Sequence, residues 1–269
     1  MIVVGELINA SRKAMGPAIE NKDRAEIQRV AKEQRDAGAD YIDVNAGIFV
    51  GQEAEYLTWL VQTVQEALEV PCCLDSPDPR AIEAALLVHK GPDAPMINSI
   101  SLEKARYEAL LPLVAGTDFK VVALCMSDEG MPETADQRLA IADRLIEGLT
   151  AAGVSLGNIF IDPLVQPLST RSDFGVEFLN AIEGIMARFP GVHTMCGLSN
   201  ISFGLPERKL LNQTFAVMAV AKGLDGLIIN PLDRRLMADL IAAEALAGRD
   251  DYCMTYLKAY RAKRFEGLS

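Results

Sequence analysis

The chain has 269 residues, of which half are hydrophobic, and its formal net charge is −11. Nucleic-acid phosphates are bound by clustered basic residues. A chain with this acidic balance is therefore not expected to bind nucleic acid. No apolar run approaches the roughly 20 residues that a membrane helix needs, no secretory leader is visible, and five cysteines without regular spacing indicate a reducing cytoplasm rather than a disulfide framework.

Short runs rich in valine and isoleucine alternate along the chain with longer amphipathic segments. Eight of the short runs are predicted strands: Ile2–Glu6, Tyr41–Asn45, Cys72–Asp75, Pro95–Asn98, Phe119–Cys125, Ile159–Asp162, Thr194–Ser199 and Leu227–Asn230. Strands that alternate with helices, without repeated hairpins, predict a parallel sheet. At this count and length we expect closure into a single (β/α)8 TIM barrel. The alternative is an open doubly wound sheet, although no strand is followed by a Gly-x-Gly-x-x-Gly turn.

Helix boundaries are marked by capping residues. Asp23 with Glu26, and Thr134 with Gln137, have the spacing of a capping box, and Gly38 suits a left-handed helix end. A last helix, at about residues 251–264, is expected to pack outside the barrel. No linker composition interrupts the chain, so residues 1–269 are predicted to form one domain.

Polar residues stand where the predicted strands end, which is where barrels of this kind carry their chemistry. The candidate site residues are Glu6, Asp43, Asn45, Asp75, Asn98, Asp162, Ser199 and Asn200. No lysine ends a strand, so a Schiff-base mechanism has no candidate amine. Neither His89 nor His193 has cysteines or carboxylates at ligand spacing, so we expect no metal site.

Carboxylates together with carboxamides suit a flat heterocycle that has a donor edge and an acceptor edge, since ionised Asp only accepts while Asn donates and accepts. A pterin is such a ring: Asp75 or Asp162 can accept from its 2-amino group and N3–H, and Asn98 or Asn200 can meet O4 and N5. Asp and Asn are also common in local turns, which is the alternative at each single position. Several together, without a competing cation, favour one polar pocket.

Six segments in order along the chain carry a family resemblance: residues 5–9 (GELIN), 43–47 (DVNAG), 74–76 (LDS), 96–99 (MINS), 161–164 (IDPL) and 197–202 (GLSNIS). Together they resemble the pterin-binding methyltransferases that act on methyltetrahydrofolate and a corrinoid protein. These enzymes are relatives of the folate domain of cobalamin-dependent methionine synthase and, more distantly, of dihydropteroate synthase. The likeness extends from about residue 1 to about residue 262.

The resemblance implies a (β/α)8 barrel that is usually a homodimer. Residues matching Asp75, Asn98 and Asp162 would hold the pterin, and the residue matching Asn200 would lie near N5 and assist methyl transfer. It implies transfer of a methyl group between N5 of tetrahydrofolate and the cobalt of a corrinoid, in a direction that the sequence leaves open. Because no Asp-x-His-x-x-Gly segment is present, the corrinoid (cobalamin) is expected on a separate protein.

Two departures from the family pattern concern contacts to the folate outside its pterin ring. Leu7 stands where the first motif commonly has arginine, and Phe203 stands where acetogenic enzymes often have a polar residue. Two rival functions remain. A dihydropteroate synthase would have an Arg-x-His pattern at the last strand, where residues 228–231 instead read IINP. A non-catalytic pterin-binding barrel would need none of the transfer chemistry.

Overall fold

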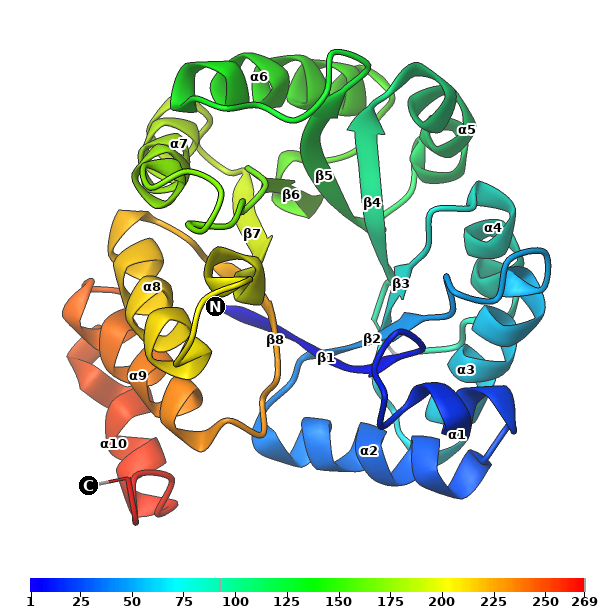
Figure 1. Cartoon of the computed structure of the whole chain (residues 1–269), viewed down its shortest axis with the longest axis horizontal. Coiled ribbons are helices and arrows are strands. Elements are labelled where there is room, and N and C mark those ends of the chain that lie inside the picture. Colours follow the sequence, from blue (N-terminus) through cyan, green and yellow to red (C-terminus); the bar gives the residue numbers. More distant parts are fainter. Residues whose placement is uncertain (92, 269) are drawn as a thin grey trace.

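The computed structural model describes residues 1–91 and 93–268. Within these residues, eight parallel strands close into one barrel in sequence order, as seen along the barrel axis in Figure 1. The strands are β1 (Ile2–Asn9), β2 (Tyr41–Asn45), β3 (Cys72–Asp75), β4 (Met96–Leu102), β5 (Lys120–Ser127), β6 (Ile159–Asp162), β7 (His193–Gly197) and β8 (Gly226–Ile229). The predicted (β/α)8 barrel is confirmed.

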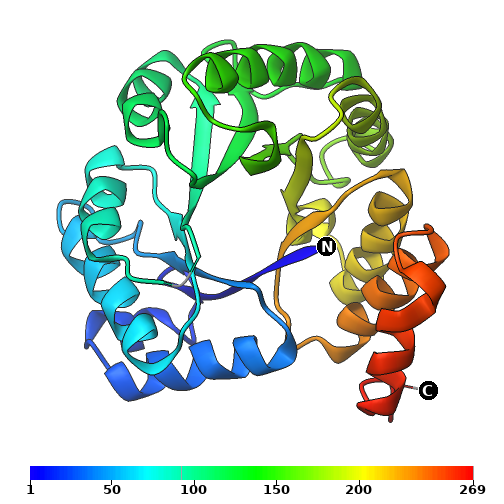
Figure 2. The same cartoon turned by 180° about the vertical axis from the view of Figure 1, so that it is seen from behind.

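Helices surround the barrel, and α10 lies outside this ring against α9, which Figure 2 shows from behind. The helices are α1 (Gly16–Glu20), α2 (Arg24–Ala37), α3 (Glu53–Ala67), α4 (Pro79–Val88), α5 (Lys104–Val114), α6 (Ala135–Ala151), α7 (Phe174–Arg188), α8 (Arg208–Lys222), α9 (Arg234–Leu246) and α10 (Met254–Arg261), with 3-10 turns η1 (Leu156–Asn158), η2 (Leu198–Ser202) and η3 (Asp251–Cys253). None of the described helices is long and apolar enough to cross a bilayer.

Local sequence explains several of the helix ends. Thr134 and Gln137 form both halves of the predicted capping box at the start of α6. Asp23 accepts a hydrogen bond from the backbone N–H of Glu26 at the start of α2, and this helix ends at Gly38 with φ of 112°. Such a backbone angle is easy only for glycine. These residues therefore place the helices, and with them the loops that follow each strand.

Alternation along the strands divides the buried side chains into two sets. One set fills the space between the sheet and the helices. The other fills the barrel interior and includes Val4, Cys73, Met96, Phe160 and Met195. Because successive side chains of a strand point to opposite faces, the residue two positions further on also faces the interior.

That period places most of the predicted polar residues in the layer above the apolar interior. From the interior residues just named, two steps toward the C-terminal end of each strand lead to Glu6, Asp75, Asn98, Asp162 and Gly197. The same period takes the interior Tyr41 to Asp43 and Asn45 in β2. The pleat of the sheet alone therefore gathers polar side chains from five strands, together with Gly197 of β7, at one end of the barrel.

The structure corrects the predicted end of the seventh strand. β7 ends at Gly197, and η2 then carries both Ser199 and Asn200, which had been expected at the strand end. Arg208 stabilises this tight turn, since its guanidinium donates to the carbonyl of Ser199 at 2.7 Å. Asn200 therefore reaches the barrel mouth from a turn above the sheet.

Other boundaries also differ from the prediction. β4 continues beyond Asn98 to Leu102, through a cis peptide bond between Asn98 and Ser99. β1 continues to Asn9, beyond the predicted end at Glu6, and α1 lies between β1 and α2. The last helix is shorter than predicted, because η3 and α10 together occupy residues 251–261.

Candidate active site

Three adjacent strands present a row of polar side chains at the barrel mouth. Asn45, Asp75 and Asn98 are register partners across β2, β3 and β4. The Asn45 amide donates from Nδ2 to Asp75 Oδ2 at 2.7 Å and accepts from the backbone N–H of Gly47 at 3.0 Å. This pair of contacts fixes which end of the amide is the donor. Within the described residues no donor reaches the other carboxylate oxygen of Asp75, which leaves it available to a ligand.

Asp43 lies one layer deeper than this row. Its exposed fraction is 2%, and its Oδ1 has no hydrogen-bond partner among the described residues. Burial raises the pKa of Asp43 well above the usual range, and the nearby charge of Asp75 raises it further, while Cys73 and Asn98 act in the opposite direction. Burial therefore favours the protonated form of this carboxyl, which is the form that can donate a hydrogen bond.

Asp162 is the carboxylate on the opposite side of the mouth. Its exposed fraction is 9%, and its Oδ1 accepts from the backbone N–H of Leu164 at 2.8 Å. Burial raises the pKa of Asp162 to about 7, although contacts with the backbones of Leu164 and Gly197 and the charge of Arg138 lower it. Near neutral pH this side chain is close to half ionised, so a ligand with a donor edge can shift it to the anion.

Gly197 leaves open space between Asp162 and Asn200. A Cβ atom built on Gly197 would meet only Nδ2 of Asn200, at 4.0 Å, and no other atom within that distance. Asn200 is exposed and belongs to η2. The interior position of β7 is therefore open, with a carboxylate on one side and a carboxamide above.

Glu6 and Ser199 line a neighbouring part of the mouth. They share a cavity of about 160 Å³ with residues of β8, α8 and the loop after β1. Glu6 pairs with Arg12 at 3.1 Å. Burial raises the pKa of Glu6, and the charges of Arg12 and Arg208 partly offset this. This cavity is continuous with η2 through Ser199, but it is separate from the Asn45–Asp75–Asn98 row.

Three arginines that the sequence analysis did not identify bind the main chain around these residues. Arg106 donates to carbonyls after β3 and within β4. Arg138, which is fully buried, donates to the carbonyl of Pro163 at 2.7 Å, directly after Asp162. Arg208 holds η2. All three lie in or near the first turn of a helix, where the helix dipole disfavours a cation. An arginine in the first turn of a predicted helix is therefore the sequence feature by which these residues could have been identified.

Other reactive groups are not arranged for chemistry. Cys73 and Cys196 are fully buried, and burial raises the pKa of both thiols well above its usual value, so neither is a thiolate nucleophile. No group of three or more His, Cys, Asp or Glu side chains in the described part of the chain could hold a metal ion. What the mouth offers is hydrogen bonding to a polar, flat ligand.

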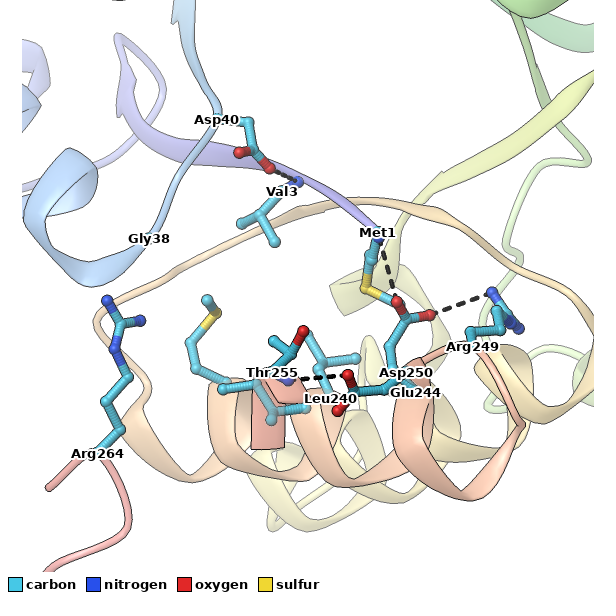
Figure 3. A pocket seen from close by; sticks show the side chains of 12 residues that line it. Met1, Val3, Gly38, Asp40, Leu240, Glu244, Arg249, Asp250, Thr255 and Arg264 are labelled. Atoms are coloured by element: carbon cyan, nitrogen blue, oxygen red, sulfur yellow. Dashed lines mark hydrogen bonds and ion pairs between the residues drawn. The ribbon is translucent and has the colours of Figure 1, made fainter. Parts of the chain in front are cut away.

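A second cavity lies at the opposite end of the barrel, near Met1, and Figure 3 shows its lining. Its polar groups pair with one another: Asp40 accepts from the backbone N–H of Val3 at 2.9 Å, and Glu244 pairs with both the amino group of Met1 and Arg249 at 3.2 Å. This end of such barrels generally serves stability. The candidate active site is therefore the C-terminal mouth.

Comparison with known proteins gave three kinds of relative. Residues 5–230 match the family model described as pterin binding enzyme. The methylcorrinoid:tetrahydrofolate methyltransferase of Eubacterium limosum is 39% identical over 263 residues, which is 97% of this chain and 96% of that protein. The methionine synthase of Mycobacterium tuberculosis is 33% identical over 245 residues, which is 86% of this chain and 20% of that longer protein.

Among solved structures, the dihydropteroate synthase of Yersinia pestis with a sulfonamide drug complex has a TM-score of 0.71 at 16% identity, over 92% of this chain and 94% of that one. The dihydropteroate synthase of Coxiella burnetii with pteroic acid has a TM-score of 0.69 at 17% identity, over 91% and 93% of the two chains. At these identities the likeness establishes the fold alone.

Proposed function

The chain belongs to the family of pterin-binding enzymes, and we propose that it is a methyltransferase that moves a methyl group between a corrinoid protein and N5 of tetrahydrofolate. The observation that carries this proposal is the 39% identity to a methylcorrinoid:tetrahydrofolate methyltransferase over nearly the whole of both chains. The carboxylates and carboxamides at the mouth support it, because they match the donor and acceptor edges of a pterin.

The proposed pterin site consists of the residues at the mouth. Asp75 and Asp162 offer carboxylate oxygens to the 2-amino group and N3–H, and Asn98 meets the acceptor edge of the ring. Asp43, whose pKa burial raises, supports Asn98 from below, and Asn45 orients Asp75 through its 2.7 Å hydrogen bond. Glu6 and Ser199 border the adjoining cavity, where we place the part of the substrate beyond the ring.

Asn200 is the proposed catalytic residue. When a methyl group leaves N5, the carbon–nitrogen bond breaks and its electron pair stays on N5, which takes up a proton from solvent, while the corrinoid protein's nucleophile bonds to the methyl carbon. A hydrogen bond from the Asn200 amide to N5 stabilises the developing lone pair. In the reverse direction the N5 lone pair attacks the methyl carbon, the pair of the broken bond stays on the corrinoid protein's nucleophile, and N5 loses its proton to solvent, while Asn200 beside N5 orients the ring nitrogen. The amide itself transfers no proton.

The corrinoid is proposed to arrive on a separate protein that docks over the mouth. Large apolar side chains are exposed on loops that follow three different strands: Ile48 and Val50 after β2, Met131 after β5 and Phe203 after η2. Exposed apolar side chains that surround a polar pocket are typical of a surface that another protein covers. This rim supports a protein partner rather than a free cofactor.

We further propose that residues 1–269 act as one domain, as a homodimer in the cytoplasm. An apolar groove between α7 and α8, lined by Leu179, Phe215 and Met218 among others, is compatible with a second copy. The five cysteines are all free thiols, which fits a reducing compartment. Light scattering on the purified chain tests the dimer.

A spectroscopic assay tests the activity. The purified chain is mixed with tetrahydrofolate and a methylated corrinoid protein, and the methyl–cobalt absorbance is followed. The expected result is loss of that absorbance together with formation of 5-methyltetrahydrofolate, and the reverse reaction is run from 5-methyltetrahydrofolate. Folate binding without turnover in either direction would indicate a non-catalytic barrel. Condensation of a pterin pyrophosphate with aminobenzoate would indicate a dihydropteroate synthase.

A further inference from the structure

Arg106, in the first turn of α5, contacts two of the strand ends that form the candidate site. Its Nη2 and Nη1 donate to the carbonyls of Ser76 and Pro77, both at 2.9 Å, in the segment that directly follows Asp75. Its Nε donates to the carbonyl of Ser99 at 2.7 Å, directly after Asn98. One guanidinium therefore joins the chain beyond Asp75 to the chain beyond Asn98.

The chemistry of the arginine side chain suits it to joining two main-chain segments. Guanidinium presents its N–H donors in a rigid planar fork and stays protonated, whereas an ammonium is a single point of charge without that geometry. Each hydrogen bond of Arg106 within the described residues goes to a main-chain carbonyl. Hydrogen bonds with a charged donor are stronger than neutral ones.

A second contact fixes the segment after β3 from the other side. The hydroxyl of Ser76, which is buried, donates to Glu53 on α3 at 2.5 Å. The segment after Asp75 is thus held between α3 and α5, and Asn45 holds the carboxylate itself. Asp75 is the group at the centre of these contacts.

We infer that Arg106 is a positioning residue for the pterin site, which aligns Asp75 with Asn98. The inference rests on the proposed function. Among the described residues, the charged or titratable groups that interact with Asp75 are Asp43 on β2, Cys73 on β3, Glu53 on α3 and Arg106 itself. Of these, only Arg106 is a cation.

Removal of the positive charge should raise the pKa of Asp75, because Arg106 lowers it now while burial raises it. Pterin binding requires Asp75 as an acceptor, so binding in Arg106→Met should be lost at a higher pH than in the parent chain. Arg106→Lys retains a cation but loses the fork, and it should weaken binding with a smaller displacement of the pH profile.

The experiment measures the dissociation constant of tetrahydrofolate by calorimetry between pH 5 and pH 8. Arg106→Met should bind about tenfold more weakly at neutral pH, a loss of about one hydrogen bond to a charged group, and Arg106→Lys should bind several-fold more weakly. Arg249 supplies the matched control, since it also donates to two main-chain carbonyls, those of Leu224 and Val220, but at the opposite end of the barrel. Arg249→Met should leave affinity and pH profile unchanged.

The outcomes separate the possibilities. If the parent chain binds tetrahydrofolate and both Arg106 variants bind it equally well with the same pH profile, Arg106 has no positioning role. A loss of thermal stability in Arg106→Met equal to that in Arg249→Met, with unchanged affinity, would show a structural role alone. If the parent chain itself does not bind folate, the proposed function fails instead.

Discussion

At the scale of single residues, environment assigns different tasks to side chains of one type. Asp43, Asp75 and Asp162 are all aspartates near the mouth, but Asp43 has an unpartnered oxygen, Asp75 accepts from Asn45, and Asp162 accepts from the backbone of Leu164. Burial raises the pKa of all three, with the effect on Asp43 strengthened by its negative neighbour. A donor edge, such as that of a pterin, offsets this burial by hydrogen bonding to the anions.

Replacement of Asn200 by alanine should slow methyl transfer about 100- to 1000-fold, the usual effect of removing one preorganised donor. Pterin affinity should change far less, because Asp75, Asn98 and Asp162 are the residues proposed to hold the ring. Single-turnover rates and calorimetry on the same samples check this. Asn158→Ala, near the opposite end of the barrel, is the control. A rate near that of the parent chain would remove Asn200 from the mechanism.

Replacement of Asp162 by asparagine should weaken tetrahydrofolate binding, since an amide oxygen cannot serve both donors of the pterin edge as a carboxylate does. It should also change how stability depends on pH. The folded-state pKa of Asp162 is raised from 3.8 to about 7. The stability that its protonated form contributes to the folded state is therefore fully present below pH 3.8 and is lost as pH rises through 7. Complete ionisation of Asp162 in the folded chain lowers the free energy of unfolding by about 4 kcal/mol.

Thermal denaturation from pH 5 to pH 8 measures this effect. The melting temperature of Asp162→Asn relative to the parent chain should rise over that interval, because only the parent chain contains the titrating Asp162 carboxyl, while the other buried carboxyls are common to both chains. A constant difference across the interval would contradict the assigned environment of Asp162. Retained folate affinity would contradict its place in the site.

At the scale of elements, the end of β7 determines how much room the mouth has. Gly197 occupies an interior position where every other described strand residue in the same layer carries a larger side chain, among them Asp162 and Asn98. Its φ of −77° is accessible to any residue, so the glycine is not needed for backbone conformation. Its missing side chain instead leaves space for a ligand beside Asn200.

Gly197→Val should therefore abolish tetrahydrofolate binding while the chain still folds, because the valine methyl groups would project into the space beside Asn200. Calorimetry measures binding, and thermal denaturation reports folding. Gly157→Val is the matched control, since a Cβ there meets no atom within 4 Å and Gly157 lies before β6, away from the mouth. Undiminished binding by Gly197→Val would place the ligand elsewhere.

At the scale of the whole molecule, the two ends of the barrel differ in what they expose. The mouth combines the polar pocket with exposed apolar side chains, of which Val50 is 90% and Phe203 63% exposed. At the other end, the polar groups around Met1 satisfy one another (Figure 3). If the proposed pterin site is correct, the corrinoid protein approaches over the loops that follow β2, β5 and β7.

Val50→Glu or Phe203→Glu should reduce kcat/KM for a corrinoid protein at least tenfold, because a buried, unpaired carboxylate opposes docking. The rate with free methylcobalamin should change little. Leu246→Glu is the control, since Leu246 is 87% exposed at the end of α9, away from the mouth. Equal losses with the protein and with the free cofactor would argue against a docking surface at these loops.

The sequence by itself determined the alternation of strands and helices and the place of most polar residues at the strand ends. Those features depend on short-range periodicity and capping, which neighbouring residues specify. Only the tertiary structure decided the turn that carries Asn200, the orientation of Asn45 toward Asp75, and the binding of Arg106 and Arg138 to loops 30 and 25 residues away in sequence. Such contacts, and the pKa values that burial imposes, depend on packing between distant segments, and no local pattern encodes that packing.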